Sequence, residues 1–206
     1  VVWIGGFGEL AIWGVFEPHA HAFDPAALTR PFGHFGNTLV APAARWDSVW
    51  FLSIADGGYA ADPNRAAFFP LYPGLVALLA PLTGALVAGM LVSFAAFFGA
   101  LVALYRLTAL ELGGPAARFA VLSLALFPGS LWFSAVYSES LFLLVSVGAV
   151  LCARERRWWL AGLLAALAAA TRSAGVLLAI PLALLWWDAR RDRQRPAPWP
   201  ALLSAP

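Results

Sequence analysis

Three short stretches of the chain gather polar residues of the kinds that do chemistry. They read RWDSVWFLSIADGGY at residues 45–59, AVYSESLF at 135–142 and ATRSAG at 170–175. Glu139 and Arg172 each lie between apolar runs, where an ionisable side chain is costly unless it is paired or solvated. They could form a structural ion pair that holds two short helices together, or they could bind a substrate directly.

Asp47 stands at the start of an amphipathic stretch. Trp46, Val49, Trp50 and Ile54 place apolar side chains roughly on one face, as in a helix that lies on a bilayer surface. Such a helix would hold the Asp47 carboxylate at the boundary between water and lipid. Asp47 could instead be the N-cap of this helix, because an Asp before a helical run accepts hydrogen bonds from free backbone amides. A capping carboxylate can also be catalytic.

Histidines offer an alternative chemistry that depends on a metal. His19, His21 and His34, together with Asp24, are of the residue types that bind metal ions. Their spacing is weakly specific, and it fits solvated loop residues or donors to a phosphate or a sugar hydroxyl better. We therefore expect no metal site, and we count His34 among the candidate substrate ligands.

The composition places these stretches in a membrane protein. Of the 206 residues, 62% are hydrophobic and 12% are charged, whereas charged residues make up about a quarter of a soluble protein. The net charge is +2 and the chain has no lysine, so nucleic acid is not an expected partner. Cys152 is the single cysteine, which excludes an intramolecular disulfide. No Walker or dinucleotide motif is present, and we expect no cofactor.

The apolar runs predict an all-α, polytopic membrane protein with about six to seven membrane helices. Residues 1–16 look like the second half of a first span, so we expect the chain to be truncated at both ends. In the hairpin that we favour, residues 158–187 form two short spans; the alternative is one long tilted helix over 157–187 with Arg172 near its middle. The remaining spans are predicted at about 84–105, 118–135 and 138–153.

Clusters of arginine set the expected orientation. The positive-inside rule predicts that all of them are cytoplasmic; they comprise Arg106, Arg118, Arg154, Arg156, Arg157, Arg190, Arg191, Arg193 and Arg195. We expect a single transmembrane domain over 1–206, with a first outer loop at 17–83, membrane helices at 84–188 and a cytoplasmic, basic and Pro-rich segment at 189–206. The three polar stretches then share the non-cytoplasmic face. The Pro-containing run at 68–81 is predicted to be half-buried or re-entrant, because a crossing there would put residues 154–157 outside.

Four stretches in order resemble the PIG-V family of GPI mannosyltransferase II enzymes and their bacterial relatives. They are RWDSVWFLSIADGGY, AAFFPLYPGLV, FPGSLWFSAVYSESLFLL and WLAGLLAALAAATRSAGVLL, over about residues 45–180. The resemblance implies the GT-C class of membrane glycosyltransferases, which take a sugar from a polyprenyl-phosphate donor at the non-cytoplasmic face. Such enzymes carry an essential acidic residue in the first outer loop, and Asp47 matches it. One departure is Ala174, which stands where the family commonly has Asn in T-R-S-N-G.

The resemblance also implies roles for the site residues. Asp47 would take the proton from the acceptor hydroxyl and invert the anomeric centre. Arg172 or Arg65 could donate paired hydrogen bonds to the phosphate, and Glu139 could orient Arg172 or a sugar hydroxyl. The apolar segment at 67–81 could form a groove for the polyprenyl chain. Further candidates for substrate or phosphate binding are Arg45, Trp46, Tyr137 and His34.

The expected partners follow from this reaction. They are a polyprenyl-phosphate-mannose donor, a lipid-linked glycan or glycolipid acceptor, and membrane lipids. The arginine-only, Ala-rich and Trp-rich composition suggests a GC-rich bacterial genome, so we expect a bacterial plasma membrane. The alternative function is a transporter or flippase in which Glu139 and Arg172 line a path and no bond is broken. The internal repeats that transporters often show are not visible in the sequence.

Overall fold

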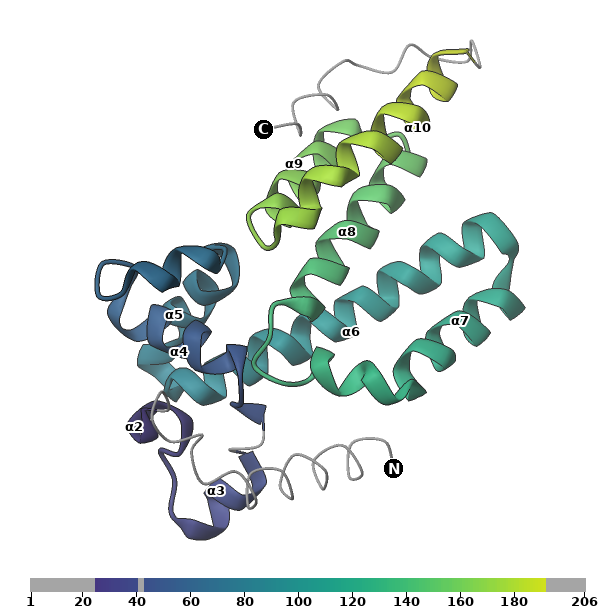
Figure 1. Ribbon diagram of the computed structural model, residues 1–206. Coiled ribbons are helices and arrows are strands. Elements are labelled where there is room, and N and C mark those ends of the chain that lie inside the picture. The colour runs from purple at the N-terminus through teal and green to yellow at the C-terminus, as the bar shows by residue number, and fades with distance from the viewer. Residues whose placement is uncertain (1–24, 41–42, 192–206) are drawn as a thin grey trace. The chain divides into compact units, whose positions relative to one another are not determined.

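The computed structural model describes residues 25–40 and 43–191, and all regular structure in these ranges is helical (Figure 1). The first helices are α2 (Ala26–Thr29), α3 (His34–Val40), α4 (Asp47–Gly57), the 3-10 helix η3 (Pro63–Ala67), α5 (Leu71–Thr83) and α6 (Ala85–Leu112). They are followed by α7 (Gly114–Leu126), η4 (Pro128–Phe133), α8 (Glu139–Arg154), α9 (Trp158–Ala169), η5 (Ser173–Leu178) and α10 (Ala179–Arg191). The all-α prediction is confirmed for these ranges.

Two helical segments in the described ranges are long and apolar enough to cross a membrane. They are α6, with 28 residues, and the continuous segment Ser173–Arg191, with 19 residues. The apolar helices α5, α7 and α9 are shorter, and a straight crossing needs about 20 residues. The count of six to seven membrane helices therefore stays a prediction.

The chain divides into two compact units. Unit 1 comprises Val1–Ala95 and Leu126–Ser140, and unit 2 comprises Ala96–Ala125 and Leu141–Pro206. Unit 1 contains the first polar stretch and residues 135–140 of the second, and unit 2 contains the third.

In unit 1, α4 packs against α5 and α2. An aromatic cluster lies at the α4–α5 contact: Phe51 meets Phe68 and Tyr72 edge to face, with ring centroids 5.2 and 5.0 Å apart, and Trp50 stacks on Phe68 at 5.7 Å. Rings packed in this way add to the burial energy of the contact. The cluster fixes the direction of α4, and with it the position of the helix start at Asp47.

The Pro-containing run at 68–81 is a helix over most of its length. Pro70 precedes α5 and Pro73 lies in its first turn, where the missing amide hydrogens have no helical acceptor. Pro81 lies near the last residue, Thr83. Tyr72, Pro73 and Val76 are buried and the opposite side is exposed. A re-entrant position in a membrane stays a prediction for this half-buried helix.

The predicted span at 118–135 is wrong as a single helix. α7 ends at Leu126, and Phe127 is extended with φ −62° and ψ 135°. Pro128 causes this break, because the ring of a proline disfavours the helical conformation of the residue before it. α6 also differs from the prediction, since it continues beyond residue 105 to Leu112.

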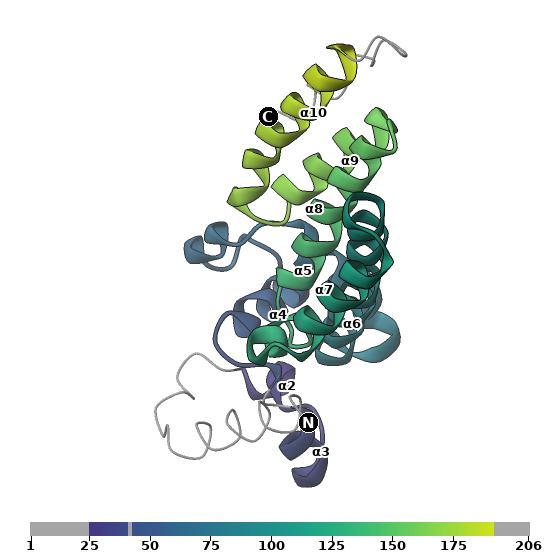
Figure 2. The same ribbon diagram turned by 90° about the vertical axis from the view of Figure 1, so that its right-hand side faces the viewer.

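In unit 2, residues 158–187 form the predicted hairpin, and the alternative of one long helix is wrong. α9 ends at Ala169, Arg172 is extended with φ −155°, and η5 starts at Ser173. A Cβ atom on Gly175 would lie 2.2 Å from the carbonyl carbon of Ala168, so only glycine permits this close return. Beyond it, α9 and α10 run side by side (Figure 2), and Trp158, Ala161, Ala165, Leu182 and Ala189 share one core.

Candidate functional site

Asp47 is the first residue of α4, and its side chain is exposed. The residue in the N-cap position is Trp46, so the alternative in which Asp47 is the N-cap is wrong. In the first turn a carboxylate still interacts favourably with the positive end of the helix dipole. The side chain of Asp47 is also accessible from outside unit 1.

Trp46 holds an unusual backbone conformation just before Asp47. Its φ is 52° and its ψ is −120°. A positive φ is rare for a bulky side chain, because the Cβ atom crowds the backbone. Strain of this kind costs about 1–3 kcal/mol and persists only where the surroundings hold the chain in place.

Hydrogen bonds from two sides hold the 43–46 segment. The carbonyl of Ala43 accepts from the Ser48 hydroxyl at 3.2 Å and from the Val136 amide at 3.0 Å. The carbonyl of Arg45 accepts from the Ser48 amide at 3.1 Å and from the Tyr137 hydroxyl at 3.0 Å. The strained turn is thus clamped between the first turn of α4 and the 134–138 segment that precedes α8.

Aromatic contacts support the same clamp. The Trp46 ring meets Trp132 edge to face with centroids 5.5 Å apart, and Trp132 meets Tyr137 at 5.1 Å. Such contacts between rings favour one arrangement of the three side chains. They join the first and second polar stretches of the sequence into one site.

A buried polar chain supports the clamp from below. The carbonyl of Tyr137 accepts from the Ser93 hydroxyl of α6 at 3.3 Å, and Ser93 shares a hydrogen bond of 2.8 Å with the Tyr72 hydroxyl of α5. Because the Ser93 proton goes to Tyr137, the Tyr72 hydroxyl shares its own single proton between Ser93 Oγ and the carbonyl of Gly89, which lies 3.0 Å away. Ser93 and Tyr72 are fully buried, where an unbonded hydroxyl would be destabilising. The network therefore fixes the position of the 134–138 segment relative to α6.

Gly89 makes this close approach possible. A Cβ atom on Gly89 would lie 2.7 Å from Cγ1 of Val136, the residue whose amide bonds to Ala43. The absence of a side chain on α6 at this position lets the 134–138 segment reach the strained turn.

Tyr137 lies near two carboxylates. Burial raises the pKa of its phenol well above the ordinary value, and the negative charges of Asp47 and then Glu139 raise that pKa further. The phenol is therefore neutral at physiological pH and acts as a hydrogen-bond donor. Asp47 is exposed and Glu139 is half-buried, so a neutral donor stands beside one accessible and one partly shielded carboxylate.

Comparison with known proteins identifies the family. The profile described as Mannosyltransferase (PIG-V) matches residues 15–183, which include all three polar stretches. The chain belongs to the PIG-V family.

Its relatives within that family are mannosyltransferases by name. The GPI alpha-1,6-mannosyltransferase 2 of Rattus norvegicus is 38% identical over 184 residues, which is 81% of this chain and 37% of the relative. The human protein of the same name is 36% identical over 176 residues, 78% of this chain and 35% of the relative. The GPI mannosyltransferase 2 of Cryptococcus neoformans is 32% identical over 154 residues, which is 68% of this chain and 36% of the relative.

The PIG-V chain thus spans well under half the length of the curated relatives that it matches. No solved structure matches it.

Two further predicted site residues of this PIG-V chain, Arg65 and Arg172, lie at the far end of α4 and in unit 2, respectively. Arg65 donates from Nη1 to the carbonyl of Gly58, the C-cap of α4. It therefore sits at the far end of an 11-residue helix, about 16 Å from Asp47 along the axis. Arg172 is half-buried at the start of η5 in unit 2, so its pairing with Glu139 and its approach to Asp47 stay predictions.

The residues of the metal alternative are only partly described. His34 begins α3, whereas His19, His21 and Asp24 lie outside the described residues. Within the described ranges, no three His, Cys, Asp or Glu residues are grouped so that they could hold a metal ion.

Tyr72, Ser93 and Trp132 connect the site and were not expected from the sequence. Ser93 did carry a signal, because it is a lone hydroxyl within the apolar run of α6, and polar residues in such helices often bond to a neighbouring segment. The contacts of Trp132 with Trp46 and Tyr137 depend on the turn at Phe127, which a continuous span at 118–135 would have removed.

Proposed function

We propose that this chain carries the catalytic base of a membrane mannosyltransferase. The complete enzyme transfers a mannosyl group from a polyprenyl-phosphate donor to a hydroxyl of a lipid-linked glycan or glycolipid. Membership of the PIG-V family and the names of the relatives support mannosyl transfer. The choice of donor, the stereochemistry and the role of Asp47 belong to the proposal.

One observation carries the assignment of the base. Asp47 is an exposed carboxylate that directly follows a strained, doubly clamped turn. A catalytic group must be held within a fraction of an ångström of its working position. The strained turn at Trp46 lowers stability, and we take its retention next to Asp47 as a sign that Asp47 has a catalytic role. The neutral phenol of Tyr137 completes the setting, because it donates its single proton to the Arg45 carbonyl and so holds the turn that carries Asp47.

The reaction proposed for this site is a single displacement. The acceptor oxygen forms a bond to the anomeric carbon while the bond from that carbon to the phosphate oxygen breaks, and its electron pair leaves with the polyprenyl phosphate. Asp47 accepts the proton of the acceptor hydroxyl. Because the acceptor attacks the face opposite the phosphate, the anomeric configuration inverts.

Arginine serves the leaving phosphate in this scheme. A guanidinium binds a phosphate through two parallel charge-assisted hydrogen bonds, and we assign this role to Arg172. Glu139 orients Arg172 or a sugar hydroxyl. Arg65, at the far end of α4, is a less suitable partner for a phosphate beside Asp47.

A cavity in unit 1 supports a binding place for the polyprenyl chain. It has a volume of about 510 Å³ and is lined mostly by apolar residues of α2, α5 and α6, among them Leu28, Ala77, Ala80 and Leu86. Lipid-chain sites are concave and apolar. The proposal therefore keeps α5 as one wall of the polyprenyl groove, and it places the active site on the non-cytoplasmic face of a bacterial plasma membrane.

The test uses the complete protein in membranes supplied with labelled polyprenyl-phosphate-mannose. Asp47→Asn keeps the size of the side chain and removes the base, so we expect product formation to fall about 100-fold or more, with unchanged protein abundance. Asp62→Asn is the matched control, because Asp62 only caps η3 by accepting from the Asn64 amide, and Asn caps about as well as Asp. Equal activity of the Asp47→Asn variant and the wild type would remove Asp47 from the mechanism.

A further inference from the structure

Trp132 is an exposed ring in a buried segment of unit 1. Most side chains of residues 130–138 are buried, among them Leu131 before Trp132 and Ser134 after it. Trp132 itself is 36% exposed. It lies in η4, directly after the break that Pro128 causes at the end of α7. The fold therefore presents a large aromatic side chain at the surface where the neighbouring residues face inward.

Two other rings hold the Trp132 ring in place. Its centroid lies 5.5 Å from that of Trp46 and 5.1 Å from that of Tyr137, with the ring planes inclined by 60° and 62°. Tyr137 is buried, whereas Trp46 is 49% exposed. Rings inclined in this way do not stack face to face, so the indoles of Trp46 and Trp132 do not cover each other. They form an aromatic corner that is open to the outside of unit 1.

The Asp47 carboxylate lies beside the same rings. Asp47 directly follows Trp46 and is exposed. Burial first, and then the negative charge of Asp47, raise the pKa of the Tyr137 phenol, so the carboxylate is close to this phenol. The ring of Tyr137 contacts Trp132, and one tyrosine side chain thus separates the carboxylate from Trp132. A hexose ring is of similar size, so it can lie on Trp132 while one of its hydroxyl groups approaches Asp47.

The face of an indole is suited to binding a sugar ring. This face carries partial negative charge, and the C–H groups on one side of a pyranose carry partial positive charge, so the two attract each other as in a weak hydrogen bond. The hydroxyl groups point outward from the rim of the sugar and stay free for other partners. An aromatic platform therefore binds a sugar and leaves a hydroxyl group accessible to a base.

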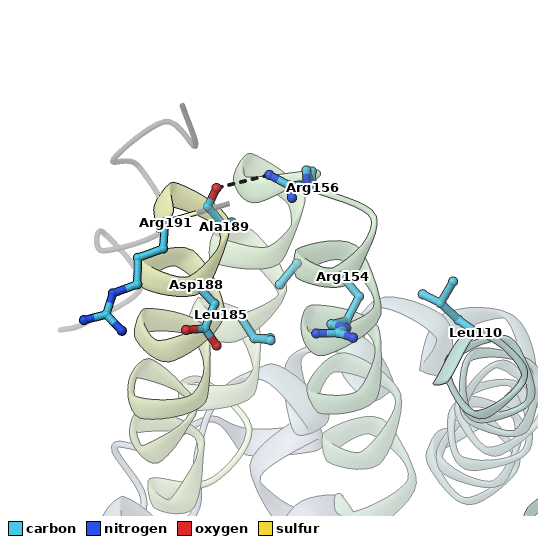
Figure 3. Close-up of a pocket in the computed structure, with 8 residues that line it drawn as sticks. Leu110, Arg154, Arg156, Leu185, Asp188, Ala189 and Arg191 are labelled. Carbon is cyan, nitrogen blue, oxygen red and sulfur yellow. Dashed lines mark hydrogen bonds between the residues drawn. The ribbon is translucent and has the colours of Figure 1, made fainter. Parts of the chain in front are cut away.

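Trp187 in unit 2 has different surroundings. It is 55% exposed on α10, and the guanidinium of Arg191 lies over its ring at 5.4 Å. Figure 3 shows the Arg191 side chain directed outward from α10. An exposed indole paired with an arginine is typical of the membrane interface, where both groups meet lipid headgroups. Trp132 is instead fixed by two rings beside a carboxylate, which favours a bound molecule over an anchor in the bilayer.

From this arrangement we propose that Trp132 is the stacking platform for a pyranose ring of the acceptor. One face of the acceptor sugar lies on the Trp132 indole, in the corner that Trp46 completes, and the reacting hydroxyl points to Asp47. The assignment of this sugar to the acceptor rests on the function proposed for Asp47, because the base accepts its proton from the acceptor. Trp132 binds the sugar and takes no part in the proton transfer.

Saturation-transfer NMR of the complete protein in lipid nanodiscs tests the platform without turnover. The probe is methyl mannoside, and mannitol is the control that has hydroxyl groups but no ring. We expect saturation of the protein to reach the C–H protons of methyl mannoside and not those of mannitol. Trp132→Leu keeps an apolar side chain and removes the aromatic face, so methyl mannoside should bind about three- to tenfold more weakly.

Trp159→Leu is the matched control, because Trp159 is an exposed indole on α9 in unit 2, and it should bind methyl mannoside as the wild type does. Equal binding by the Trp132→Leu variant and the wild type, or equal transfer to mannitol and methyl mannoside, would overturn the inference. Trp132→Phe keeps an aromatic face and a ring against Tyr137, so it should recover most of the binding. A loss as large as that of Trp132→Leu would show that Trp132 serves packing alone.

Two further arms separate this inference from the function proposed for Asp47. Saturating polyprenyl-phosphate-mannose should leave methyl mannoside bound; displacement would show that Trp132 holds the donor sugar, and the acceptor assignment would be wrong. The Asp47→Asn variant should still bind methyl mannoside through Trp132. Sugar binding at Trp132 together with full transfer by Asp47→Asn would reject the base and keep the sugar site, whereas loss of transfer without sugar binding at Trp132 would reject the platform alone.

Discussion

The turn before Asp47 in unit 1 and the turn after α8 in unit 2 each contain a non-glycine residue with a positive φ, but the two turns have different surroundings. Trp46 and Arg156 are the non-glycine residues with positive φ in the part of the chain that the structure describes. Trp46 is held by Ser48, Tyr137 and a buried chain of hydroxyl groups, and it positions its neighbour, Asp47. Arg156 is surrounded by exposed ion pairs, and it presents its own side chain.

The two surroundings contribute differently to stability. Neutral hydrogen bonds in a buried network are lost only at a clear cost, because a buried polar group left without a partner is destabilising. Exposed ion pairs are weak and are screened by solvent. Unit 1 therefore holds the backbone before Asp47 through buried hydrogen bonds, whereas the exposed ion pairs at the end of unit 2 contribute little to stability.

The largest expected effect comes from replacing glycines at which two segments of the chain pack closely against each other. Gly175→Ala should prevent folding of the hairpin in unit 2, because the added Cβ atom meets the backbone of Ala168 at 2.2 Å and cannot move away from it. Gly89→Ala should cost less, since it meets only the Val136 side chain. Thermal unfolding of the purified variants measures both, with Gly114→Ala as the control, where the added Cβ atom has no neighbour within 4 Å. A stable Gly175→Ala variant would contradict the packing of the hairpin.

Tyr137→Phe should have the next largest effect. It removes the donor to the Arg45 carbonyl and should lower the free energy of unfolding by about 1–2 kcal/mol. The rate of sugar transfer should fall about tenfold, because the turn before Asp47 loosens. Tyr105→Phe, on the exposed side of α6, is the control. Unchanged transfer in the Tyr137→Phe variant would separate the clamp from catalysis.

A smaller effect should appear at alkaline pH. Because the folded protein holds the Tyr137 pKa above its ordinary value, the unfolded chain releases this proton first as the pH rises past about 10. The stability linked to this proton is fully present below pH 10 and is lost as the pH increases further. Unfolding temperatures measured between pH 8 and pH 11 should therefore fall less steeply for Tyr137→Phe than for the wild type. Parallel curves would contradict a buried, neutral phenol.

The smallest effect is expected from the exposed ion pairs of unit 2. Arg106 donates to Glu155 at 2.8 Å, and the Arg106 side chain is 57% exposed. Arg106→Gln should change the free energy of unfolding by about 0.5 kcal/mol or less. If Arg106→Gln lowered the free energy of unfolding as much as Tyr137→Phe does under the same conditions, the two regions would not differ in the way described here.

Local chemistry in the sequence predicted part of this arrangement. The hairpin at 158–187 was expected because the polar stretch at 170–175 separates two short apolar runs, and the start of α4 near Asp47 was expected from the amphipathic stretch that begins there. Long-range features could not be predicted in this way. The approach of Tyr137 to Arg45 depends on Pro128, which ends α7 and turns the chain, and on Gly89, which admits Val136. Neither residue has a polar side chain, so the sequence alone does not indicate that either one belongs to the site.

The role of Asp47 is tested most directly by steady-state kinetics of the complete protein with Asp47→Asn. Removal of a general base should lower kcat about 100-fold or more while the KM for the polyprenyl-phosphate donor changes little. A kcat equal to that of the wild type, or a loss confined to KM, would contradict the assignment of Asp47 as the group that accepts the proton.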